Sequence, residues 1–196
     1  CVSPNLLHKF MYLNGTMKVS NEQVRELVMK KFEEKTIHST RIFNGRIISL
    51  KVDEVSLPNG GTSNREIVNH PGAVAVIALT DDNKLILVEQ YRKALERSII
   101  EIPAGKLEKG EEPLETAKRE LEEETGYAAG EITYLQSFAT SPGFADEIIH
   151  LYIAKNLSVV EEKKQLDEDE FVELMEVTIE EAEELIIKGK IYDAKT

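Results

Sequence analysis

Residues 105–127 read GKLEKGEEPLETAKRELEEETGY, a segment that contains both a start signal and a stop signal for a helix. Pro113 lacks a backbone N–H and has a fixed φ, both of which suit the first turn of a helix. Gly126 suits the position just after a last helical turn, where the backbone often becomes left-handed. We therefore predict a helix from Pro113 to about Thr125, preceded by a loop over residues 105–110.

The predicted helix carries a cluster of glutamates. Glu123 and Glu124 follow Glu120 by three and four residues, which places the three carboxylates on one helical face. Such charges repel one another unless a cation neutralises them, and Mg²⁺ prefers oxygen ligands of this kind. Read without its surroundings, the same helix is better interpreted as a solvated acidic surface.

The residues around the cluster favour a site over a solvated surface. Fixed residues at fixed gaps across the segment match the Nudix box: Gly105, Glu111, Arg119, Glu120, Leu121, Glu123, Glu124 and Gly126. The last position departs, because Tyr127 stands where an aliphatic residue is usual. The chain resembles a Nudix hydrolase. This resemblance implies an α+β fold, an α/β/α sandwich in which a loop–helix–loop motif lies on a mixed β-sheet.

The resemblance also implies roles for these residues. Glu120 and Glu124 are expected as catalytic metal ligands, with Glu123 contributing less uniformly and the backbone carbonyl of Ala104 as a further ligand. The expected cofactor is Mg²⁺, with Mn²⁺ as a possible substitute. Supporting roles are expected for four residues: Glu111 and Arg119 brace the ligating glutamates, and Gly105 and Gly126 permit backbone conformations that a side chain would forbid.

Residues outside this segment indicate which Nudix subfamily the chain resembles. Pro142 lies 16 residues after Gly126, in the stretch SPGFADE over residues 141–147. This stretch is similar to the signature of ADP-ribose pyrophosphatases, as are HPGAVAV at residues 70–76 and EIPAG at residues 101–105. The similarity spans about residues 35–196. It implies Mg²⁺-dependent hydrolysis of ADP-ribose to AMP and ribose 5-phosphate.

The subfamily resemblance suggests the remaining site residues. Glu147 is the expected general base, with Glu168 and Glu170 as rivals. Five residues are expected to bind substrate: Arg65 and Arg92 through the phosphates and nucleotide, Phe43 through the adenine, and Pro142 and Gly143 through their loop. His70 and His150 are interpreted as structural.

Two other functions are open at this point. The substrate could be another nucleoside diphosphate derivative, such as a nucleotide sugar, or a dinucleoside polyphosphate or mutagenic nucleoside triphosphate. Alternatively the chain could be a non-catalytic ADP-ribose sensor, which would be expected to lack the glutamates and to carry a DNA-binding domain. The intact glutamates argue against a sensor.

The net charge, the hydropathy and the cysteine content of the chain indicate which binding partners and which cellular compartment to expect. With 24 basic and 36 acidic residues the net charge is -12, so the surface should repel nucleic acids and anionic membranes. No apolar run approaches the roughly 20 residues that a membrane-spanning helix needs. A single cysteine fits a reducing cytoplasm.

Three regions are predicted along the chain. Residues 1–35 form an extension or a short helix over 20–34, residues 36–69 form antiparallel strands that the resemblance assigns to a homodimer interface, and residues 70–196 form the Nudix hydrolase domain. The predicted strands are 41–43, 46–57, 63–69, 73–79, 84–91, 98–102, 131–139, 148–154 and 173–177, with a loop at 140–147 and a second helix at 179–188.

Overall fold

A computed structural model describes residues 31–161 and 171–196. These residues divide into two compact units, residues 31–39 with 53–64 and residues 40–52 with 65–161 and 171–196. The helix predicted over residues 20–34 falls mostly outside the described residues. Its last part, residues 31–34, is described and begins with a turn, so the prediction is wrong there.

The first three strands form a sheet of their own in the order β1-β2-β3. They are β1 (Lys35–Asn44), β2 (Ser49–Ser56) and β3 (Thr62–Asn69). A turn that contains Gly45 joins β1 to β2, where the Gly45 N–H donates to the Ile48 carbonyl at 2.9 Å. In the first unit, Asp53 is buried and accepts hydrogen bonds from the hydroxyls of Ser39 and Thr36.

The larger unit is built on a seven-stranded mixed sheet with the central order β10-β5-β4-β9-β8. Its strands are β4 (Ala73–Leu79), β5 (Leu85–Arg92), β6 (Arg97–Glu101), β7 (Ala104–Lys106), β8 (Tyr127–Ala139), β9 (Ile148–Val159) and β10 (Val172–Val177). β4 runs parallel to β9 and antiparallel to β5. β8 and β9 are longer than predicted because they pair with each other along almost their whole lengths.

The centre of this sheet splits, and the split positions the site. β4 and β5 pair only at Ala78↔Ile86 and Leu79↔Leu85. Beyond that point β7 pairs with β4, and β6 pairs with β5. The segment from β6 to β7 therefore lies inside the sheet, where the carbonyl of Pro103 accepts from the Val76 N–H at 2.8 Å. The predicted loop at residues 105–110 is wrong for its first two residues, which belong to β7.

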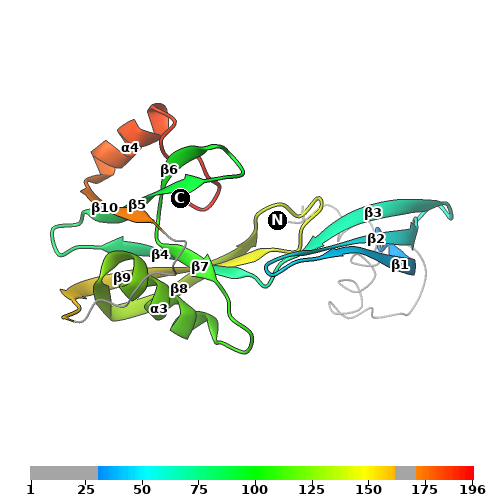
Figure 1. The fold of residues 1–196 in the computed structure, drawn as a ribbon, viewed down its shortest axis with the longest axis horizontal. Coiled ribbons are helices and arrows are strands. Elements are labelled where there is room, and N and C mark those ends of the chain that lie inside the picture. The colour runs from blue at the N-terminus through cyan, green and yellow to red at the C-terminus, as the bar shows by residue number, and fades with distance from the viewer. Residues whose placement is uncertain (1–30, 162–170) are drawn as a thin grey trace, which may run out of the picture. The chain divides into compact units, whose positions relative to one another are not determined.

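Two helices cover opposite faces of the sheet (Figure 1). They are α3 (Pro113–Thr125) and α4 (Ile179–Ile187). The buried cluster that contains Val74, Val76 and Ala78 of β4 also contains Ala117 and Leu121 of α3. Ala75 of the same strand belongs to the other cluster, with Ala182 of α4. Because successive strand residues point to opposite faces, the uninterrupted apolar run of β4 serves both layers, and the predicted α/β/α sandwich is confirmed.

Over the residues that the structure describes, neither helix combines the length and apolarity that crossing a membrane requires.

Candidate active site

Helix α3 has the boundaries that its sequence predicts. Pro113 occupies the first turn, and Gly126 ends the helix with φ 74°, donating its N–H to the Glu122 carbonyl at 2.9 Å. This φ lies in the left-handed region that favours glycine. The helix face that packs on the sheet carries Ala117 and Leu121, and it also buries Glu120 and Glu124.

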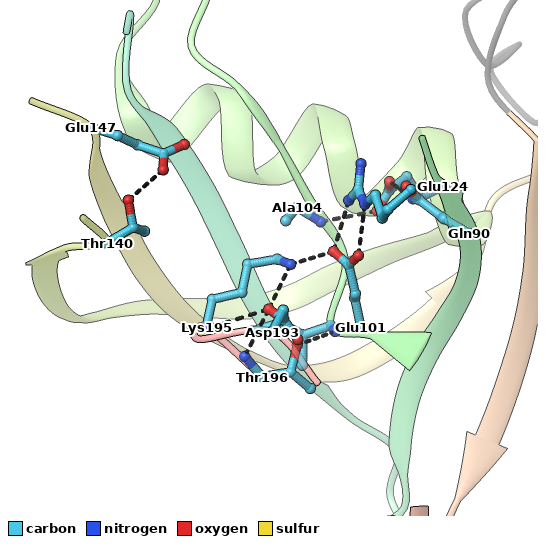
Figure 2. A network of polar contacts seen from close by, with 11 residues as sticks. Gln90, Glu101, Ala104, Glu124, Thr140, Glu147, Asp193, Lys195 and Thr196 are labelled. Atoms are coloured by element: carbon cyan, nitrogen blue, oxygen red, sulfur yellow. Dashed lines mark hydrogen bonds and ion pairs between the residues drawn. The ribbon is translucent and has the colours of Figure 1, made fainter. Parts of the chain in front are cut away.

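Glu124 is held by two donors from the split sheet. Its side chain is buried, with the residue only 3% exposed. Gln90 Nε2 of β5 donates to Oε1 at 2.6 Å, and the backbone N–H of Ala104 in β7 donates to Oε2 at 2.9 Å (Figure 2). A buried carboxylate requires such partners, because its charge is costly to remove from water. The split between β4 and β5 therefore creates the environment of Glu124.

Glu120 lies directly against the backbone of Gly105. A Cβ atom built at Gly105 would lie 1.9 Å from Cδ of Glu120 and 2.0 Å from its Oε1. No side chain can occupy that space while the carboxylate stays where it is. The requirement for glycine at position 105 thus comes from the close approach of a glutamate that lies 15 residues later in the same segment.

Arg119 joins the acidic residues of the segment. Its Nε and Nη2 atoms each donate to a different oxygen of Glu111 at 3.1 Å, and Nη1 lies 2.9 Å from oxygens of both Glu120 and Glu123. The hydrogen bond with Glu111, followed by the charges of Glu120 and Glu123, raises the pKa of Arg119. The same pair lowers the pKa of Glu111. One arginine therefore fixes three carboxylates, as expected for a residue that braces metal ligands.

A second arginine forms a buried pair beside this cluster. Arg92, the last residue of β5, donates through Nε at 2.6 Å and Nη2 at 2.7 Å to the two oxygens of Glu101. The Glu101 side chain is 2% exposed, whereas that of Arg92 is 41% exposed. Hydrogen bonding to Glu101 raises the pKa of Arg92, and the charge of Glu124 adds to this effect. Of the α3 carboxylates, Glu124 is the one whose charge acts on Arg92.

The loop at residues 140–147 carries the predicted base. Glu147 Oε2 accepts a hydrogen bond from Thr140 Oγ1 at 2.5 Å, and Oε1 lies 3.4 Å from Nδ1 of His70. His70 was interpreted as structural, and the structure adds that its ring touches this carboxylate. The loop is bonded to β3, since the N–H of Val68 donates to the Phe144 carbonyl and the N–H of Asp146 donates to the Val68 carbonyl.

The residues predicted to bind substrate, other than Arg92, lie in the 140–147 loop and on strands β1 and β3. Pro142 and Gly143 are exposed in the 140–147 loop, and Arg65 is half-buried on β3. Phe43 lies on β1 in the three-stranded sheet and is 54% exposed. The rival bases Glu168 and Glu170 lie outside the described residues.

The residues of α3 fit a divalent cation by their donor chemistry. Glu120, Glu123 and Glu124 supply carboxylate oxygens, which suit hard cations. Within the described residues, no three acidic, histidine or cysteine side chains are already grouped as metal ligands. In this structure Arg119, Gln90 and the Ala104 N–H are the partners of these carboxylates instead.

Several residues that contact the site carry no role that the motifs predict. Glu101 is one of them, although it lies in the EIPAG stretch. Ala104 of the same stretch is predicted as a ligand through its carbonyl, and the structure adds that its N–H donates to Glu124. Gln90, Thr140 and Lys195 carry no sequence signal, because each meets its partner through the sheet or a loop rather than through a motif.

Comparisons with known proteins identify the family of the chain. The NUDIX domain family matches residues 69–195, and the nucleoside diphosphate sugar hydrolase N-terminal domain matches residues 34–68. The chain is 64% identical to an ADP-ribose pyrophosphatase of Bacillus subtilis (strain 168), over 86% of this chain and 91% of that protein. It is 66% identical to a methanol dehydrogenase activator of Bacillus methanolicus, over 85% and 90% of the two chains.

More distant relatives extend the same picture. An ADP-ribose pyrophosphatase of Mycobacterium tuberculosis is 36% identical over 85% of this chain and 81% of its own. A crystal structure of an ADP compounds hydrolase has a TM-score of 0.69 at 21% identity, covering 79% of this chain and 83% of that one, and it shows a shared fold. The motif, the fold and these relatives together place the chain in the Nudix hydrolase family, in its ADP-ribose pyrophosphatase subfamily.

Proposed function

We propose that this Nudix hydrolase cleaves the pyrophosphate bond of ADP-ribose in a reaction that requires Mg²⁺. Water would add to one phosphorus, the bond from that phosphorus to the bridging oxygen would break, and AMP and ribose 5-phosphate would leave. The observation that carries the proposal is the buried carboxylate pair on α3, where Glu124 is held by Gln90 and Ala104. The relatives named ADP-ribose pyrophosphatase support the choice of substrate.

Glu120, Glu123 and Glu124 would hold the Mg²⁺, with the Ala104 carbonyl as a further oxygen ligand. When bound, the cation would neutralise negative charge on the phosphoryl oxygens and lower the pKa of a bound water molecule. Arg119 and Glu111 keep the carboxylates in place, and Mn²⁺ is the expected substitute. A nucleotide sugar is the alternative substrate class.

Glu147 is the proposed general base. Its carboxylate would take the proton of the attacking water, as a positioned carboxylate can do. Thr140 donates to one oxygen and His70 lies beside the other, so the orientation of the carboxylate is restricted before substrate arrives.

We propose that arginine side chains bind the phosphates of the substrate and that an aromatic side chain stacks on its adenine. Arg92 would bind a phosphate, since a guanidinium matches phosphate geometry and has more N–H groups than the two that Glu101 uses. Arg65 would lie nearer the nucleotide, Phe43 would stack on the adenine, and the loop at Pro142 and Gly143 would border the ligand.

Residues 36–69 are proposed as a homodimerisation element beside the hydrolase domain of residues 70–196. All ten residues of β1 are exposed, including Ile37, Ile42 and Phe43. Exposed apolar clusters often mark interfaces. The charge of -12 supports a small-molecule substrate rather than nucleic acid, and the single cysteine supports a cytoplasmic location.

The proposal is tested by product analysis. The protein is incubated with Mg²⁺ and separately with ADP-ribose, ADP-glucose, dinucleoside polyphosphates and 8-oxo-dGTP. AMP and ribose 5-phosphate should form fastest from ADP-ribose, and Glu124→Gln should remove nearly all turnover. Glu115→Gln, at an exposed position of the same helix, is the matched control. Efficient turnover of another compound without AMP release from ADP-ribose would overturn the substrate assignment.

The identity to a methanol dehydrogenase activator supports a second candidate function, activation of such a dehydrogenase. The test adds the purified chain to a methanol dehydrogenase and measures the rate of alcohol oxidation. Stimulation by the wild type but not by Glu124→Gln would tie activation to hydrolysis. No stimulation by the wild type would remove this second function.

A further inference from the structure

We infer that Lys195 is a positioning residue of the active site, which acts through Glu101 to fix the side chain of Arg92. The inference rests on the proposed function in one respect, because it takes Arg92 as the contact for a substrate phosphate. Lys195 lies in the segment after α4, 94 positions along the chain from Glu101.

Glu101 is a buried carboxylate with two cationic partners. Its side chain is 2% exposed, and burial alone would raise its pKa. The hydrogen bonds from Arg92 and the charge of Lys195 outweigh burial, so the pKa of Glu101 lies below its ordinary value. Arg92 contacts both oxygens, and Lys195 Nζ contacts Oε2 as well. The carboxylate is therefore held between two cations.

Lys195 is itself held in place. Its side chain is 10% exposed, and Nζ donates to Asp193 Oδ2 at 2.9 Å. That oxygen also accepts from the backbone N–H of Lys195 at 3.1 Å. Arg92, Glu101, Lys195 and Asp193 thus form a row of alternating charges (Figure 2 shows the last three). Only the Arg92 end is substantially exposed, with 41% of its side chain accessible.

Residues 190–196 also form hydrogen bonds with β6 and with Ile102, just before the Ala104 N–H that donates to Glu124. The N–H of Ile100 donates to the Lys190 carbonyl at 2.9 Å, and the N–H of Ile102 donates to Thr196 Oγ1 at 3.1 Å. These bonds lie on either side of Glu101. Two residues beyond Ile102, the N–H of Ala104 donates to Glu124. Residues 190–196 therefore contact the backbone that carries both the Arg92 partner and a Glu124 partner.

This arrangement has a consequence for substrate binding. Two bonds to one carboxylate fix the plane of the Arg92 guanidinium, and its remaining N–H groups keep a constant direction. Without Lys195, Glu101 would keep a single cation in a buried place and would take up a proton more readily. A protonated Glu101 no longer accepts two hydrogen bonds from Arg92, so the phosphate contact would lose its orientation.

The kinetic test compares Lys195→Met with wild type, using ADP-ribose as substrate. We expect KM to rise about tenfold with kcat within about twofold, because a contact made equally in ground and transition states is weakened. The rise in KM should grow as the pH falls, since Glu101 then protonates in the variant. Lys188→Met, which removes an exposed lysine paired with Glu184 on α4, should leave both constants unchanged.

A double-mutant cycle separates positioning from a general loss of stability. If Lys195 acts through Glu101, Lys195→Met should add little to the KM of Glu101→Gln. Independent, additive effects in the cycle would overturn the inference, as would a wild-type KM in Lys195→Met. A fall in kcat and melting temperature with KM unchanged would overturn it too, because that pattern indicates only a structural role.

An NMR measurement without substrate tests the role of Lys195 independently of the proposed function. The Nε–H NMR signal of Arg92, assigned with Arg92→Lys, should be resolved in wild type and Lys188→Met and lost by exchange in Lys195→Met. If wild type does not hydrolyse ADP-ribose but the signal behaves as expected, the substrate proposal fails and the positioning role stands. If the signal is unchanged in Lys195→Met, the positioning role is wrong whatever the substrate.

Discussion

Single residues in this protein acquire their roles from partners that are far away in the chain. Glu124 is one of several glutamates in an acidic helix, yet it differs from Glu115, which is exposed and paired with Lys118. Gln90 and the Ala104 N–H hold Glu124 in a buried position beside the sheet. Burial with satisfied hydrogen bonds separates a site residue from a solvated one of the same type.

At Glu147 we predict that replacement by glutamine lowers turnover without preventing metal binding. Loss of a general base typically reduces the rate by about 100-fold to 10,000-fold. The measurements are kcat for ADP-ribose and calorimetric titration with Mg²⁺, and Glu131→Gln, at an exposed position of β8, is the matched control. Wild-type rates in Glu147→Gln would assign the base to another residue, with Glu168 and Glu170 the next candidates.

At Gly105 we predict a large loss of activity with a small loss of stability on substitution by alanine. The new Cβ would displace the Glu120 carboxylate, which is the mobile end of a side chain and can move. The expected result is a fall in kcat of roughly 10-fold to 100-fold, the range for disturbing the support of a metal ligand. Thermal unfolding should change little. Gly143→Ala, where a Cβ would meet nothing within 4 Å, controls for the effect of adding a methyl group on stability.

At the scale of elements, the 140–147 loop is tied to the end of β3 by Asp146. Its Oδ2 accepts from Asn69 Nδ2 at 2.7 Å, and its Oδ1 accepts from the backbone N–H of His70 at 2.8 Å. Desolvation acts to raise the pKa of Asp146, but these hydrogen bonds outweigh it, and the pKa lies below its ordinary value. The loop that carries Glu147 is therefore bonded to β3 through a charged group.

This contact predicts a pH dependence. A carboxylate whose pKa is lowered on folding stabilises the fold fully above its unfolded pKa of about 3.9, and the contribution is lost as the pH falls through the lower, folded value. Asp146→Asn should lower the free energy of unfolding at pH 7 and flatten its decline below about pH 4. Urea unfolding at several pH values measures both effects. An unchanged pH profile would show that Asp146 does not link the loop to β3 in solution.

At the scale of the whole molecule, the exposed strand β1 predicts self-association. Ile37, Ile42 and Phe43 of this strand are all more than half exposed, and so is Ile47 in the turn that follows it. Exposed large apolar side chains concentrated in one stretch of chain often mark an interface. We expect a dimer of twice the 22.1 kDa chain mass. Ile42→Glu should shift it to monomer in sedimentation velocity, whereas Ile187→Glu, at an exposed position of α4, should not. A wild-type monomer at micromolar concentration would contradict the prediction.

Local sequence was sufficient for much of this protein. Short-range signals determine the backbone conformation and which side chains share a face. They are the helix signals at Pro113 and Gly126, the spacing of the glutamates by three and four residues, and the apolar run of β4. These features predicted α3 and most of the strands, whereas the α/β/α sandwich and the family were implied by the resemblance of residues 105–127 to the Nudix box. They succeed because the hydrogen bonds of a helical turn and the alternation of a strand depend on residues close together in the chain.

Long-range pairing determined what the sequence left open. The strand β7, the pairing of Gln90 with Glu124 and the pairing of Arg92 with Glu101 depend on how β4 and β5 separate around the β6–β7 segment. The contact of His70 with Glu147 depends on the parallel pairing of β4 with β9, since these two residues precede those strands. The partners Glu101 and Lys195 are 94 residues apart, so no spacing rule connects them. Residues 105–127 therefore identify the catalytic helix by themselves, whereas the partners that orient its glutamates are brought to it by strand register, which depends on the packing of the whole sheet.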